Sequence, residues 1–178
     1  HVHEKLGIQD MSAFAKCEIS GPGAEAWLDQ LLTNAVPKKV GRVTLSYLLT
    51  NKGGVRSEFT VYKVAPQRYY LVSAGAYERH DHDYLKKAMP RDGSVRFERL
   101  TTSMGVLVLA GPRARDALSK ITDADLSNEA FPWLTGKKIS LGLAQVEALR
   151  VNFIGELGWE IHHPIEMQNY IFDLLMEA

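Results

Sequence analysis

A ring and a carboxylate stand on either side of a glycine-rich turn in the segment VNFIGELGWEIHH, residues 151–163. Two glycines bracket the turn, which places Phe153 at the end of one predicted strand and Glu160 early in the next. Across such a hairpin the two side chains can lie close together. The pair would suit a flat heterocycle with amidine-like donors, because the ring stacks on the heterocycle and the carboxylate accepts two N–H groups. A core phenylalanine and a glutamate at the rim are the competing interpretation.

A second acid, Glu58, lies in the middle of a strand-like segment, NKGGVRSEFTVYKV, that begins with a glycine-rich turn. Side chains alternate along a strand, so Glu58 shares one face with Arg56, Thr60 and Tyr62. Such a polar face is usually the solvated side of an antiparallel sheet. The alternative is that Glu58 faces a ligand, and this segment alone leaves both interpretations open.

Hydrophobic spacing predicts the elements that must position these residues, and their order indicates an α+β fold with antiparallel sheets and flanking helices. Strands are expected near residues 12–20, 43–50, 55–64, 69–74, 94–100, 104–111, 137–141, 144–153 and 157–163. Helices are expected over residues 21–34, 76–89, 111–122 and 164–178. The two acids and the phenylalanine therefore all fall on predicted strands.

An internal repeat accompanies this order of elements. GPGAEAWLDQLL (21–32) and GPRARDALSKI (111–121) share the pattern Gly-Pro-x-Ala-x-x-x-Leu, and each follows a predicted strand. We interpret them as a duplicated strand-Gly-Pro-helix unit. The expected organisation is a single unit over residues 1–178, cut short at its C-terminus, with pseudo-repeat halves at residues 10–90 and 100–178.

The two acids themselves are about a hundred residues apart, and each lies on a predicted strand after a glycine-rich turn. If the halves are related by a pseudo-twofold axis, Glu58 and Glu160 should line one cavity. Close buried carboxylates repel each other, so we expect enough separation for the two acids to hold different parts of one ligand.

The composition excludes several classes of protein. The chain has 178 residues, of which 46% are hydrophobic, with 21 basic and 21 acidic residues. This balance gives no electrostatic attraction to nucleic acid or to anionic membranes, and no apolar run is long enough to span a bilayer. A single cysteine permits no internal disulfide, which suits a reducing compartment. Because Cys17 falls on the apolar side of its strand, we expect a buried structural thiol.

Motifs for other chemistries are missing. The chain has neither a dinucleotide fingerprint nor a phosphate-binding loop that ends in Gly-Lys-Ser/Thr. His80 and His82 are two positions apart on a predicted helix, and His162 and His163 are adjacent on a strand, so each pair should diverge. We therefore expect no metal site and no flavin held by this chain.

Several longer motifs resemble a known family. The stretches are GIQDMSAFAKCEISGPGAEAWLDQLLTN, NKGGVRSEFTVYK, GVLVLAGPRARDAL, DLSNEAFPWLT and ALRVNFIGELGWEIHHP. They are similar to the folate-binding part of dimethylglycine and sarcosine dehydrogenases, which itself resembles glycine-cleavage T-protein (aminomethyltransferase). The resemblance runs from about residue 5 to the end of the chain.

This resemblance implies tetrahydrofolate binding and assigns roles to the candidate residues. Glu58 matches the acid near the reacting folate nitrogens, and Ser57 replaces the acid that precedes it in T-protein. Phe153 matches a tyrosine that packs against the pterin, so stacking is kept and the hydroxyl is lost. Glu160 matches the glutamate that binds the pterin N–H groups.

The resemblance also implies a function in one-carbon (aminomethyl or methylene) transfer. The partners would be folate and an adduct of a small secondary or tertiary amine, with FAD only in a domain or subunit absent from this chain. The expected location is the cytoplasm, or the mitochondrial matrix in a eukaryote. The alternative is a non-catalytic folate-binding or regulatory module that keeps the same fold.

Overall fold

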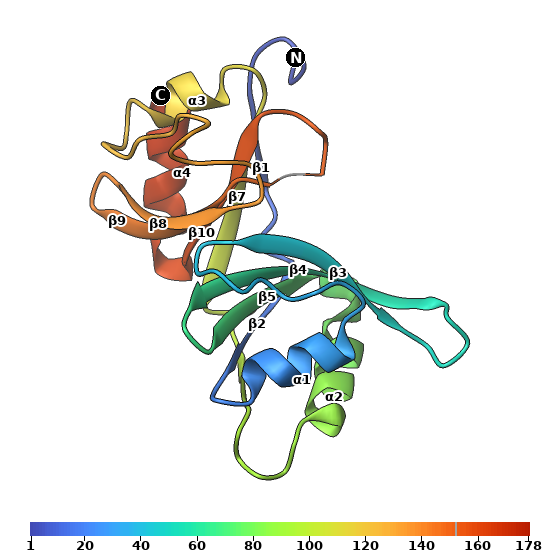
Figure 1. Ribbon diagram of the computed structural model, residues 1–178. Helices are drawn as coiled ribbons and strands as arrows, with labels where there is room; N and C mark the ends of the chain where they lie inside the picture. Colours follow the sequence, from blue (N-terminus) through green and yellow to red (C-terminus); the bar gives the residue numbers. More distant parts are fainter. Residues whose placement is uncertain (152) are drawn as a thin grey trace. The chain divides into compact units, whose positions relative to one another are not determined.

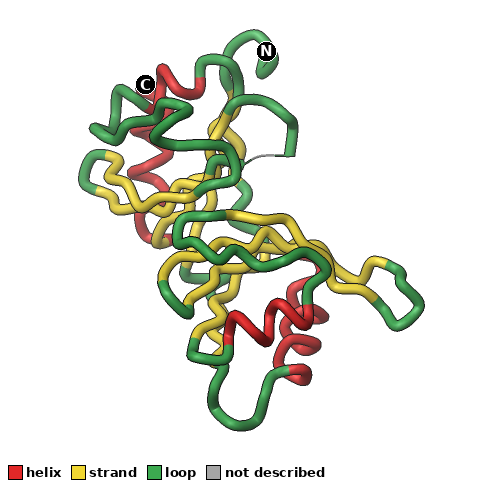
Figure 2. The backbone as a smooth tube through the Cα atoms, viewed as in Figure 1, coloured by secondary structure: helices red, strands yellow, loops and turns green. Residues whose placement is uncertain are grey.

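The computed structural model describes residues 1–151 and 153–178, and the chain forms two compact units (Figure 1). The continuous unit is Phe14–Thr101. The split unit combines His1–Ala13 with Thr102–Ala178. Each unit contains one five-stranded sheet whose paired strands are antiparallel, accompanied by helices (Figure 2). The predicted α+β fold class with antiparallel sheets and flanking helices is confirmed.

In the continuous unit the strand order is β3-β4-β5-β2-β6. Its elements are β2 (Ala15–Ser20), α1 (Ala24–Leu31), β3 (Val43–Leu49), β4 (Val55–Ala65), β5 (Arg68–Ser73), the 3-10 turn η1 (Gly75–Tyr77), α2 (Glu78–Ala88) and β6 (Arg96–Arg99). Trp27 of α1 and Leu85 of α2 pack in one core with Cys17 and Phe59 of the sheet. Both helices therefore cover one face of this sheet, and the predicted burial of Cys17 is confirmed.

In the split unit the strand order is β1-β7-β10-β9-β8. Its elements are β1 (Gly7–Asp10), β7 (Met104–Ala110), α3 (Ala114–Leu118), β8 (Gly136–Leu141), β9 (Ala144–Leu149), β10 (Gly158–Pro164), the 3-10 turn η2 (Ile165–Met167) and α4 (Gln168–Glu177). Leu118 of α3 and Ile171 of α4 pack in one core with Leu109 and Trp159. Of the helices that the structure describes, none combines the length and apolarity needed to cross a membrane.

The two units share one connectivity. In chain order, β2-α1-β3-β4-β5-α2 of the continuous unit correspond to β7-α3-β8-β9-β10-α4 of the split unit, and the sheet orders correspond strand for strand. The fifth strand is exchanged, because β1 precedes β2 in the chain but pairs with β7, and β6 precedes β7 but pairs with β2. A duplicated ancestral unit, with halves near residues 10–90 and 100–178, stays our proposal.

The Gly-Pro turns that begin the repeated helices are built alike. The N–H of Gly21 donates to the Gln67 carbonyl just before β5, and the N–H of Gly111 donates to the Leu157 carbonyl just before β10. Both glycines have positive φ, at 115° and 134°. A side chain at Gly111 would meet the Lys5 carbonyl oxygen at 2.6 Å, so the close approach to the exchanged edge strand requires glycine.

Two local expectations are wrong, and the two acids fall on different strands of the repeat. Strand β9 ends at Leu149 and does not reach Phe153, because the Val151 N–H turns back to donate to the Leu149 carbonyl. Strand β1 was not expected, since its four residues show no clear alternation. Glu160 lies on β10, which corresponds to β5 and not to β4, so the two acids do not occupy equivalent strands of the repeat.

Candidate functional site

Glu160 is a buried carboxylate on β10 of the split unit. Its neighbours along the strand, Trp159 and Ile161, belong to the core beneath the helices, so Glu160 points to the other face of the sheet. Glu160 lies directly opposite Val108 of β7 and is 2% exposed. The rim glutamate considered as the alternative is therefore wrong.

The ring of His162 accompanies this carboxylate. His162 Nε2 lies 3.2 Å from Glu160 Oε2, and His162 is fully buried. Residues two apart on a strand share a face, so the Glu-Ile-His spacing was the sequence signal for this pair. Within the residues that the structure describes, this is the one hydrogen bond found for the Glu160 carboxylate, which can accept several more.

Phe153 lies in the loop between β9 and β10, and its side chain is 67% exposed. It lines an apolar cleft of about 290 Å³ with Ile154 and with residues of β1 and β7, among them Ile8 and Val108. Val108 is also the residue directly opposite Glu160. Val108 is therefore a common neighbour of the two residues, as a lining residue of the cleft with Phe153 and as the strand partner of Glu160, although Phe153 is neither at the end of a strand nor in the core.

Glu58 is an exposed carboxylate on β4 of the continuous unit. Tyr47 of β3 lies directly opposite it, and the Tyr47 hydroxyl hydrogen-bonds to Glu58, which raises the pKa of Tyr47. Thr60 and Tyr62 follow on the same side of β4 but are buried, so the solvated strand face considered as the alternative holds only around Glu58. A cavity shared by Glu58 and Glu160 stays a prediction.

Comparison with known proteins identifies the family. The model of the GCVT N-terminal domain family matches residues 1–178. The chain belongs to this family. It is 36% identical over 178 residues to mouse dimethylglycine dehydrogenase, with 99% of this chain and 20% of that protein covered. It is 29% identical over 178 residues to the mouse pyruvate dehydrogenase phosphatase regulatory subunit, with 98% and 20% covered.

A solved structure has the same fold as this GCVT N-terminal domain. The crystal structure of glycine cleavage system aminomethyltransferase T from Bartonella henselae superposes with a TM-score of 0.85 at 24% identity, covering 99% of this chain and 46% of that one. The chain thus spans under half of that protein and about a fifth of the curated relatives. The predicted family membership is confirmed.

Ser57, which precedes Glu58 in this GCVT N-terminal domain, points into the core. Its hydroxyl donates to Asp81 in the first turn of α2, and the Ser73 hydroxyl donates to the same carboxylate at 3.0 Å. Asp81 is 1% exposed, and His80 Nδ1 lies 3.2 Å from it. The serine therefore joins α2 to the sheet, a role that sequence spacing did not indicate.

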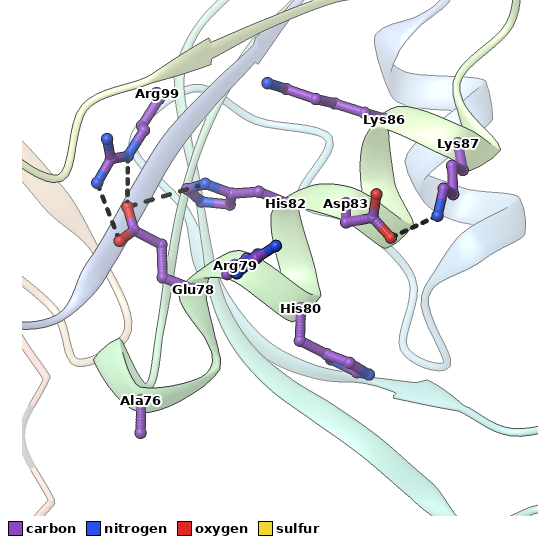
Figure 3. A pocket seen from close by; sticks show the side chains of 9 residues that line it. All are labelled: Ala76, Glu78, Arg79, His80, His82, Asp83, Lys86, Lys87 and Arg99. Carbon is purple, nitrogen blue, oxygen red and sulfur yellow. Dashed lines mark hydrogen bonds and ion pairs between the residues drawn. The ribbon is translucent and has the colours of Figure 1, made fainter.

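A charged hollow of about 930 Å³ lies along α2 (Figure 3). Arg99 donates to both oxygens of Glu78, at 2.6 and 3.1 Å, and this contact lowers the pKa of Glu78 to about 2. His82 lies 3.8 Å from Glu78 and edge-on to the Phe97 ring, and burial lowers the pKa of His82. None of the three predicted site residues lines this hollow. In the described part of the chain no group of three or more potential metal ligands is found.

Proposed function

We propose that this chain is a tetrahydrofolate-binding unit for one-carbon transfer within a dimethylglycine or sarcosine dehydrogenase-like enzyme. The observation that carries the proposal is a buried carboxylate beside an apolar cleft with an exposed aromatic ring, in a member of the GCVT N-terminal domain family. The aminomethyltransferases of this family depend on folate. The mouse relative is named as a mitochondrial dimethylglycine dehydrogenase, so the proposal extends to amine oxidation by the whole protein and to a mitochondrial location.

The cleft residues fit the ring system of a reduced folate. Phe153 offers a ring face for stacking, and the volume of about 290 Å³ is close to the smallest ligand pockets of proteins. The Glu160 carboxylate can accept N–H groups beside Val108, where burial would strengthen such hydrogen bonds. When bound, tetrahydrofolate would supply the ring nitrogens that receive the one-carbon unit.

Glu58 is proposed as the acid of the transfer step. Its carboxylate is accessible, and the Tyr47 hydroxyl orients it. It would accept a proton at a carboxylate oxygen or stabilise positive charge that develops on the amine adduct. The adduct would derive from a small secondary or tertiary amine, and its oxidation would need a flavin-containing domain or subunit.

Titration with tetrahydrofolate tests the binding part of this proposal. We expect quenching of tryptophan fluorescence on saturable binding. Glu160→Gln should weaken binding by about 1.5–3 kcal/mol, since it removes a charged acceptor. Phe153→Ala should weaken binding by about 1 kcal/mol through lost stacking.

Phe172→Ala is the matched control for Phe153→Ala, because Phe172 of α4 is also exposed, at 40%, and lies outside the cleft. It should bind tetrahydrofolate as the unchanged chain does. Equal affinity of all three variants would overturn the assignment of the cleft, and absence of binding to the unchanged chain would overturn the proposed function.

A non-catalytic module is the second candidate function, and the similarity to a phosphatase regulatory subunit favours it. Such a module could bind folate without transferring a one-carbon unit. Formation of 5,10-methylenetetrahydrofolate by the complete protein, with dimethylglycine or sarcosine as the amine, separates the two candidates.

A further inference from the structure

Two arginines of the split unit lie against the same buried indole. The guanidinium carbons of Arg115 and Arg150 are 5.9 and 5.8 Å from the centroid of the Trp159 ring. The side-chain carbonyl of Asn128 accepts from both guanidinium groups, at 2.8 and 2.7 Å. Each arginine also donates an N–H to a backbone carbonyl of its own, Arg115 to Leu126 and Arg150 to Phe131. In the described part of the chain, the acceptors that hold these two like charges close together are all neutral.

In the described part of the chain, this cluster lacks a negative charge to balance its two arginines and has fewer acceptors than N–H donors. Arg68 and Arg99 each pair with a glutamate, whereas in the described part of the chain no carboxylate lies within ion-pair distance of Arg115 or Arg150. Burial lowers the pKa of Arg150, and the charge of Arg115 adds to this effect. Among the residues that the structure describes, none accepts from the buried Trp159 Nε1–H. Spare donors and unbalanced positive charge are what an oxyanion needs.

Arg150 lines a hollow of about 420 Å³, and another part of its wall is flat and apolar. The indole of Trp133 lines this hollow and is 66% exposed, which is unusual for a ring of its size. The glycine turn that starts at Gly155 forms another wall, and there is open space where a side chain of Gly155 would lie. Glu156 also lines the hollow, and its carboxylate hydrogen-bonds to His3.

We propose that this hollow binds a small carboxylate carried on a flat ring, with the carboxylate on Arg150 and the ring on Trp133. Asn128 accepts from both arginines and so keeps Arg115 near Arg150, where the charge of Arg115 makes the local potential more positive. The hollow shares no lining residue with the cleft of Phe153, so the two proposals can be tested separately.

Three probes separate the parts of the proposal. Benzoate carries both ring and charge, benzamide carries the ring without charge, and inorganic phosphate carries the charge without the ring. We expect saturable changes in the NMR indole resonance of Trp133 with benzoate, and at least about tenfold weaker binding of benzamide and of phosphate. Benzamide that binds as tightly as benzoate, or benzoate that fails to saturate, would overturn the site.

Variants locate the binding. Trp133→Ala changes an exposed side chain and should weaken benzoate binding at least fivefold, as followed by calorimetry. Arg150→Gln should abolish it, and Arg150→Lys should retain part of it, because the charge remains while the two-point geometry is lost. Circular dichroism checks the fold of the Arg150 variants, and Trp133→Ala tests the site if they unfold.

Arg113→Gln is the matched control, since Arg113 is an exposed arginine directly before α3, the helix that contains Arg115. It should leave benzoate binding unchanged, as should Phe153→Ala. Loss of benzoate binding in Phe153→Ala, together with normal binding in Trp133→Ala, would place benzoate in the other cleft and overturn the assignment. Folate titration is unaffected by this outcome, so the two proposals fail separately.

Discussion

The two predicted acids, Glu160 and Glu58, differ most in their surroundings. Glu160 is enclosed beside His162, whereas Glu58 is accessible to solvent with the Tyr47 hydroxyl as its partner. A buried carboxylate can hold donors tightly because water competes little for its hydrogen bonds. An accessible carboxylate exchanges protons and contacts readily. The two environments therefore favour a holding role for Glu160 and a reacting role for Glu58.

Glu58→Gln in the complete enzyme should slow one-carbon transfer by about 10²-fold, since a general base is lost. The folate KM should stay within about twofold, because Glu58 is not proposed to hold the ring. Steady-state kinetics with dimethylglycine and tetrahydrofolate measure both constants. Glu98→Gln is the control, as Glu98 is another exposed acid of the same unit. A normal transfer rate in Glu58→Gln would show that the acid has no part in the step.

At the scale of elements, the Gly-Pro turns connect each repeated helix to the exchanged edge strand. The Gly23 N–H donates to the Ser94 carbonyl before β6, and the Arg113 N–H donates to the Lys5 carbonyl before β1. These corresponding bonds link segments about seventy and one hundred residues apart in the chain, and they place helix and edge strand together. The turns should therefore contribute strongly to the stability of each unit.

Gly111→Ala should lower the free energy of unfolding by about 3 kcal/mol, because its φ of 134° suits only glycine and the new methyl group would meet backbone at Lys5. Gly53→Ala is the matched control. Its φ is also positive, at 78°, but open space surrounds it, so the cost should be about 1 kcal/mol. Urea-induced unfolding measures both values. Equal costs would show that the contact with Lys5, in the segment before β1, is unimportant.

At the scale of the whole molecule, buried histidines make stability depend on pH. Burial lowers the pKa of His82 and of His163 below the usual 6.5. The unfolded chain therefore binds more protons than the folded chain below about pH 6.5, and stability is lost as the pH falls. A second loss should follow below about pH 4.5, as protons compete for Glu78, whose pKa is held at about 2 mainly by Arg99.

Thermal unfolding between pH 8 and pH 3 measures both losses. The double variant His82→Gln/His163→Gln should show a flatter decline in Tm between pH 7 and pH 5 and keep the decline below pH 4.5. A Tm that rises from pH 7 to pH 5 in the unchanged chain would contradict the assignment to the histidines.

The sequence by itself determined the class of fold, most strands and helices, the repeated Gly-Pro turn and the family. These features depend on local pattern, such as the unbroken apolar run MGVLVLAG, or on long motifs such as ALRVNFIGELGWEIHHP. The same spacing placed Cys17 on the buried side of its strand. Local pattern suffices there because an element's period fixes which side chains share a face.

Tertiary structure decided which segments complete each sheet and what surrounds each acid. The exchange of β1 and β6 joins residues about a hundred positions apart, and four-residue edge strands carry too little pattern to reveal their partner. The chain reversal at Val151 moved Phe153 off its predicted strand and into the cleft. Burial of Glu160 and exposure of Glu58 likewise follow from long-range packing, since both acids lie on strands of similar local pattern.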